Sequence, residues 1–104
     1  MKAITEVDME THEVTHLYKI NKNDALWKSM MLIGETAKLG SQPLKTGRAR
    51  RMIANEIPQN QQNLAREWIG KCRKWHSHNQ AHELVLSIDD MVVIDKLAEI
   101  CYKL

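Results

Sequence analysis

The arginines are the residues best suited to chemistry in this 104-residue chain, and they are concentrated in one segment. Residues 41–82 hold all of them: Arg48, Arg50, Arg51, Arg66 and Arg73. A guanidinium group is a planar fork that donates paired hydrogen bonds to phosphates and carboxylates. The segment carries eight Lys or Arg against two Asp or Glu, a net charge of +6, whereas residues 1–40 and 83–104 carry −1 and −3. This basic segment therefore predicts an anionic partner.

A helix-turn-helix pattern lies within the basic segment, over residues 51–69. The motif needs a small residue where two helices cross, an aliphatic residue before the turn and another midway along the second helix. Ala54, Ile57 and Leu64 have that spacing. Pro58 stands where Gly is frequent, and Trp68 comes one place later than the usual closing residue. The resemblance is to a generic motif over less than a fifth of the chain.

The second helix of this motif would begin with amide side chains, which can pair with two atoms of an adenine in the major groove. These are Gln59, Asn60, Gln61, Gln62 and Asn63. Basic side chains would bind phosphates and fix the register of the protein on the duplex. Those candidates are Arg48, Arg50, Arg51, Arg66, Lys71, Arg73 and Lys74. The sequence thus predicts a small non-enzymatic regulator that binds nucleic acid, DNA ahead of RNA.

Three other interpretations stay open. The basic segment is also explained by acidic flanks that pack against it, and residues 51–69 by a plain helical hairpin with an amide-rich loop. The third is a protein-interaction or inhibitor module whose basic face binds an acidic protein surface, as in small regulators of phages and mobile elements. Methionine is frequent here, with six residues, and suits a pliant surface that completes its packing against a second copy or another protein. A homodimer is left open.

A metal site is a weaker candidate, built from Cys72, His76, His78 and His82. Two residues four apart in a helix lie on the same face, which would pair Cys72 with His76 and His78 with His82. Zinc accepts such S and N ligands. The grouping lacks a finger spacing, however, and Cys72 belongs to an apolar seam where a buried thiol is ordinary. We therefore predict no bound metal. A second pair, His12 and His16, is interpreted as surface.

Catalysis and cofactor binding are not predicted, because the sequence has no nucleophile elbow, glycine-rich phosphate loop or paired carboxylate motif. Two cysteines are too few for a disulfide framework. The chain does not open on a signal peptide and has no apolar run of about 20 residues, so no membrane contact is expected. A cytoplasmic protein with reduced thiols is the expectation.

The elements that position these residues are predicted to be mainly α-helical, in one domain over residues 1–104. Helices are expected over residues 24–39, 47–56 and 60–76, and from Ser87 to the end, which makes a small bundle of about four. Periodic apolar residues define the third helix, at Leu64, Trp68, Cys72 and Trp75. Residues 1–20 fit neither period, so a strand, a short hairpin and an extended arm stay open. The tryptophans are placed in the core, with an exposed, base-stacking Trp75 as the alternative.

Overall fold

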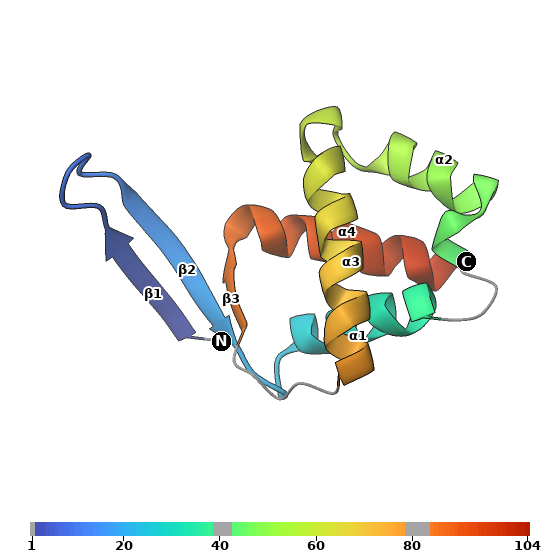
Figure 1. The fold of residues 1–104 in the computed structure, drawn as a ribbon, viewed down its shortest axis with the longest axis horizontal. Helices are drawn as coiled ribbons and strands as arrows, with labels where there is room; N and C mark the ends of the chain where they lie inside the picture. Colours follow the sequence, from blue (N-terminus) through green and yellow to red (C-terminus); the bar gives the residue numbers. More distant parts are fainter. Residues whose placement is uncertain (1, 39–42, 79–83) are drawn as a thin grey trace.

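The computed structural model describes residues 2–38, 43–78 and 84–104, and Figure 1 shows a helical body from which a hairpin projects. The elements are β1 (Lys2–Val7), β2 (Val14–Ile20), α1 (Ala25–Lys38), the 3-10 turn η1 (Pro43–Lys45), α2 (Gly47–Glu56), the 3-10 turn η2 (Gln59–Gln61), α3 (Gln62–His78), β3 (Leu84–Ser87) and α4 (Ile88–Lys103). A mainly helical chain is confirmed. The bundle is confirmed only in part, because the described residues also form a three-stranded sheet.

Residues 2–20 form a hairpin, so the structure adopts the hairpin among the alternatives predicted for this segment. The sheet is antiparallel in the order β1-β2-β3, with Val7 opposite Val14 at the tip of the hairpin. Only the end of the sheet nearest the helices is buried, where Ile20 and Leu86 are 1% and 0% exposed. The rest of the hairpin extends away from the body (Figure 1). The short strand β3 lies in the stretch that joins the third and fourth predicted helices, for which the sequence predicts no strand.

The core lies where α1 crosses α3 and α4. The apolar seam predicted for α3 is buried, Cys72 included, and it packs against buried apolar residues of α1 and α4 such as Met30, Ile33 and Ile94. Trp68 and Trp75 are also buried, at 6% and 8% exposure, and Trp27 is partly buried against the core. The rings of Trp27 and Trp75 meet edge to face, with centroids 4.7 Å apart. The alternative of an exposed, base-stacking Trp75 is therefore wrong, because this ring is part of the core.

Two helices begin at short polar residues whose side chains cap them. The Thr46 hydroxyl accepts a hydrogen bond from the Ala49 amide at 3.2 Å and caps α2. At the start of α4, Ser87 and Asp90 form a reciprocal capping box. The Asp90 carboxylate accepts from the Ser87 amide at 3.0 Å and from the indole N–H of Trp68 at 2.8 Å. One carboxylate thus caps α4 and fixes it to the middle of α3.

Gly34 sets how closely α1 and α3 approach each other. A Cβ atom added at Gly34 would lie 2.5 Å from the carbonyl oxygen of Cys72 and 2.7 Å from the Cβ atom of His76. The nearer of these is backbone and cannot move aside without shifting α3. The glycine is therefore required by the packing of the two helices, and any larger residue would force them apart.

We expect Gly34→Ala to lower the free energy of unfolding by about 1–3 kcal/mol, the usual cost of overpacking a well-packed interior. Urea denaturation followed by circular dichroism measures the change. Gly47→Ala is the matched control, because no atom lies within 4 Å of a Cβ built there. An alanine at Gly34 that leaves stability unchanged would show that α1 and α3 are not held at this contact.

Candidate nucleic-acid interface

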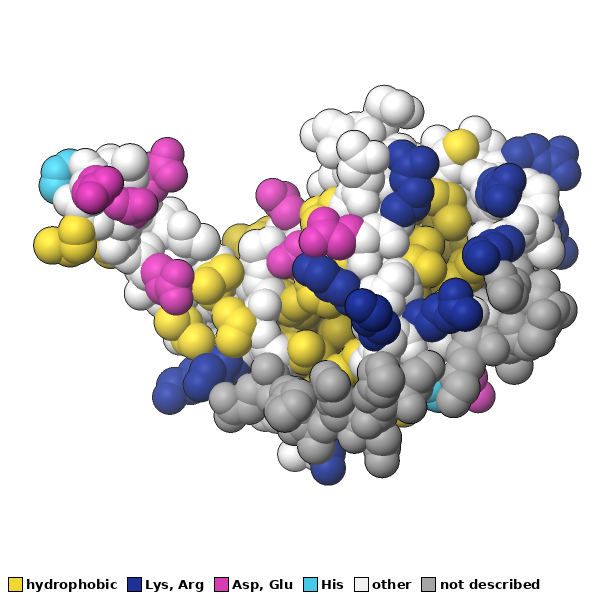
Figure 2. Space-filling model, in the orientation of Figure 1, with side chains coloured by type: hydrophobic (Ala, Val, Ile, Leu, Met, Phe, Trp, Pro, Cys, Tyr) yellow, Lys and Arg dark blue, Asp and Glu magenta, His cyan; other side chains and the backbone are white. Residues whose placement is uncertain are grey.

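One face of α3 carries a stripe of exposed polar and basic residues. Its members are spaced three, four, three and one apart, so they lie on one side of the helix: Asn63, Arg66, Gly70, Arg73 and Lys74. Figure 2 shows Lys and Arg side chains gathered over α2 and α3, with apolar surface exposed between them. The opposite side of α3 is the buried seam. This α3 stripe is the part of the basic segment that the fold presents as a continuous surface.

The three arginines of α2 do not all share one face, because Arg50 lies on a different side of the helix from Arg48 and Arg51. Arg48 points to the C-terminus of α4, where its guanidinium donates to the Lys103 carbonyl at 3.2 Å. Arg51 donates to the Gly47 carbonyl of its own helix at 3.4 Å. Arg50 lines the groove between α2 and α3 together with Arg66. Among the α2 arginines, therefore, the structure brings only Arg50 to the α3 stripe.

The described residues contain no ion pair between an arginine and a carboxylate. Arg66 donates to the amide oxygen of Asn63 at 2.8 Å, which is a neutral partner. Lys71 is different, because it pairs with Glu67 at 2.9 Å and lies 4.7 Å above the ring of Trp68. Within the described ranges, the acidic flanks therefore do not neutralise the arginines as one alternative proposed. The charge of Lys71, by contrast, is neutralised by a carboxylate of its own helix.

The connection between α2 and α3 differs from the predicted helix-turn-helix in three respects. Residues 59–61 form a 3-10 turn, so α3 begins at Gln62. Gln62 is not a free base-reading side chain, because its amide donates to the carbonyls of Ile53 and Ile57 at 2.9 and 2.7 Å and satisfies the end of α2. Ala54 is exposed, so the small residue of the motif is not at a helix crossing. The α2 backbone instead approaches α4 and η1.

A groove of about 520 Å³ separates α2 from α3. Apolar side chains from three elements line it, Leu44, Ile53 and Ile69, and the Gln62 amide lies beside them. Three cations also line it: Lys45, Arg50 and Arg66. No pattern in the sequence predicts this groove, since it arises from the separation of α2 and α3. Its chemistry suits a ligand that is apolar and anionic together.

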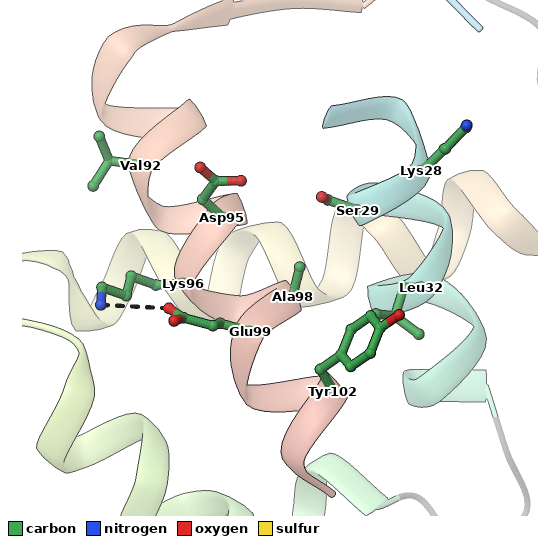
Figure 3. A pocket seen from close by; sticks show the side chains of 9 residues that line it. All are labelled: Lys28, Ser29, Leu32, Val92, Asp95, Lys96, Ala98, Glu99 and Tyr102. Atoms are coloured by element: carbon green, nitrogen blue, oxygen red, sulfur yellow. Dashed lines mark hydrogen bonds and ion pairs between the residues drawn. The ribbon is translucent and has the colours of Figure 1, made fainter. Parts of the chain in front are cut away.

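A second hollow, of about 730 Å³, lies between α1 and α4 (Figure 3). The Tyr102 ring lies beside Leu32, and Tyr102 is 85% exposed. Both signs of charge occur around it, and Lys96 pairs with Glu99 at 3.5 Å. This mixed lining selects for no particular ligand charge.

The residues of the weak metal candidate are not gathered as a ligand set. Cys72 is fully buried beneath Gly34, and His76 is half-buried beside it. His82 and the side chain of His78 lie outside what the structure describes. Among the described residues, no three His, Cys, Asp or Glu side chains are placed to hold a metal ion.

Burial, and secondarily the charge of Cys101, raise the pKa of the Cys72 thiol to about 12. Burial also raises the pKa of Cys101.

No protein-family model, curated protein or solved structure matches this chain. Function must therefore be argued from its own residues. In the portion of the chain that the structure describes, none of the helices has the length and apolar character needed to cross a bilayer.

The Cys72 pKa predicts how stability depends on pH. An unfolded thiol ionises near its ordinary pKa of 9.0, whereas the folded Cys72 thiol stays neutral to about 12. Since the unfolded state then binds fewer protons, the free energy of unfolding should fall as pH rises from 9.0 towards 12. Urea denaturation between pH 8 and pH 10.5 measures this slope, which should be shallower in Cys72→Ala. Equal slopes in the two proteins would contradict the buried, neutral thiol.

Proposed function

We propose that this protein binds the phosphate backbone of nucleic acid, DNA ahead of RNA, and acts without catalysis. The observation that carries the proposal is the α3 stripe. Arg66, Arg73 and Lys74 are exposed on one helix face, and within the described residues none of them pairs with a carboxylate. Guanidinium and ammonium groups in such a row match successive phosphates and release condensed counterions when they bind. Arg50 extends the row across the groove from α2.

Gly70 gives independent support for a close ligand at the centre of the stripe. Glycine inside a helix costs about 1 kcal/mol relative to alanine, so it usually has a packing reason. Gly70 has none in the described structure, because no atom lies within 4 Å of a Cβ built there. It lies between Arg66 and Arg73 on the same face. We infer that the missing side chain allows a phosphate or sugar to approach the helix backbone between the two guanidinium groups.

Base reading is proposed for fewer residues than the sequence predicted. Gln59 and Asn60 are exposed in η2, at the end of the stripe. Asn63 has its amide oxygen engaged by Arg66, which leaves its NH₂ group to donate. Gln61 is half-buried and Gln62 is committed to the end of α2. Gln59, Asn60 and the NH₂ group of Asn63 are therefore the proposed base contacts.

The double substitution Arg73→Ala and Lys74→Ala should weaken binding to duplex DNA and lower the slope of log K against log salt by roughly 2, one for each lost phosphate contact. Fluorescence anisotropy with a labelled duplex, at several salt concentrations, measures both. Lys22→Ala with Lys28→Ala is the matched control, because it removes the same charge from exposed residues elsewhere. If both double variants lose the same amount of affinity for DNA, the loss results from the change in net charge and not from the α3 stripe. If neither DNA nor RNA binds at low salt while polyglutamate does, the partner is an acidic protein.

Gly70→Ala separates binding from folding. It should raise the free energy of unfolding by about 0.5–1 kcal/mol, since alanine favours the helix. The same variant should bind nucleic acid more weakly, because the added methyl group occupies the space proposed for the backbone of the ligand. Denaturation and anisotropy on one sample test both statements. A Gly70→Ala protein that binds as tightly as the wild type would leave the glycine without a role in binding.

A further inference from the structure

The tip of the β1–β2 hairpin is both acidic and apolar. Residues 3–18 contain no Lys or Arg but four carboxylates, Glu6, Asp8, Glu10 and Glu13. Met9 is 83% exposed, and Val7 and Val14 are each 53% exposed. Scattered apolar residues are normal on a surface, but three together on a projecting tip mark an interaction site. Figure 1 shows the tip at the free end of the hairpin, far from the helical body.

The tip has a defined shape before it meets any partner. The Asp8 carboxylate accepts hydrogen bonds from the amides of Glu10 and Thr11 at 2.9 and 3.2 Å. The Asp8 amide donates to the Glu13 carbonyl, and the His12 amide to the Asp8 carbonyl. His12 has a φ of 60°, which closes the loop. Since these contacts already order the loop, little conformational entropy remains to be lost on docking.

The groove between α2 and α3 has the complementary chemistry. Leu44 and Ile53 are 7% and 8% exposed, so they form a packed apolar wall, while Lys45, Arg50 and Arg66 supply positive charge along it. A volume of about 520 Å³ leaves room for a long, unbranched apolar side chain such as that of Met9. Carboxylates on either side of that side chain would meet guanidinium and ammonium groups, with which they form charge-assisted hydrogen bonds.

A molecule cannot fill its own groove with its own tip. The molecule, hairpin included, is 46 Å long, and Figure 1 shows the hairpin tip at one end of the long axis and α2 at the other. Two copies related by a twofold axis across the long axis would each bring the tip to the groove of the other. Such an arrangement makes both contacts at once and closes on itself. We propose that this protein forms a reciprocal homodimer in which the 6–14 hairpin tip of each copy, led by Met9, docks into the α2–α3 groove of the other.

Charge reversal on each side of the contact tests the proposal. The tip variant is Glu10→Lys with Glu13→Lys, whose side chains make none of the hydrogen bonds of the loop. The groove variant is Arg50→Glu with Arg66→Glu. Alone, each variant places like charges together and should dimerise roughly 100-fold more weakly than the wild type. Mixed in equal amounts, they restore opposite charges at both contacts, so the dimer should return. Sedimentation velocity over a concentration series measures monomer and dimer.

Two more proteins complete the test. Glu35→Lys with Glu99→Lys makes the same change in charge on α1 and α4 and should dimerise as the wild type does. Met9→Ser keeps every charge and should weaken the dimer, because the apolar anchor is lost. A wild-type protein that stays monomeric up to about millimolar concentration, or a mixture that stays monomeric, overturns the proposal. A tip variant that dimerises as well as the wild type also overturns it and indicates another contact, such as pairing along the exposed edge of β1.

Dimer formation and nucleic-acid binding can be tested separately. The tip variant changes no residue of the α3 stripe, and Arg73 and Lys74 do not line the groove. A dimer that forms and responds to charge reversal in a protein that binds no DNA supports only the present inference. DNA binding by a protein that is monomeric throughout supports only the other.

Discussion

The contact between Gly34 and the Cys72 carbonyl places the centre of α3 directly against α1, and most of the architecture depends on it. With no side chain at Gly34, the two helices approach closely enough to bury Cys72 completely and to bring Trp75 against Trp27. The carboxylate of Asp90 then fixes α4 to the same helix through the indole of Trp68. Helix α3 is thus held on two sides by its neighbours. The side that remains open is the α3 stripe, so the position of the basic surface follows from the packing beneath it.

Those parts of the fold that depend on local signals could be predicted from the sequence. Thr46 and Ser87 cap helices because a short polar side chain satisfies free amides one turn away, whatever surrounds it. The spacing of Trp68 and Cys72 likewise reveals the buried side of α3, since helical periodicity is a property of the segment itself. Strand β3 could not be predicted in this way. It is only four residues long, and its identity depends on pairing with β2, where Leu86 lies opposite Tyr18.

The residue types of the candidate site could be predicted from the sequence, but their arrangement in space could not. Sequence located the basic segment and named its residues, but it could not tell which of them share a surface. Arg48 is directed to the end of α4 because α2 lies against α4, whereas Arg51 donates to a carbonyl of its own helix. The role of Gln62 was also inaccessible, since its amide reaches back to carbonyls five and nine residues earlier. The direction of Arg48 depends on how α2 packs against α4, and the role of Gln62 depends on how the chain turns between α2 and α3. No pattern within a single helix encodes either arrangement.

The hairpin also divides the molecule into parts of unequal local stability. Strand β1 pairs with β2 alone, and its side chains are exposed apart from a half-buried Ile4. Opening it therefore sacrifices hydrogen bonds but little apolar burial, whereas opening α4 uncovers side chains such as Leu97 and Ile100 that are fully enclosed. Amides of β1 are accordingly expected to exchange with solvent through local opening, and those of α4 only when the whole body unfolds. Any partner that covers the hairpin would reveal itself first as slower exchange in this strand, even without a change in the rest of the fold.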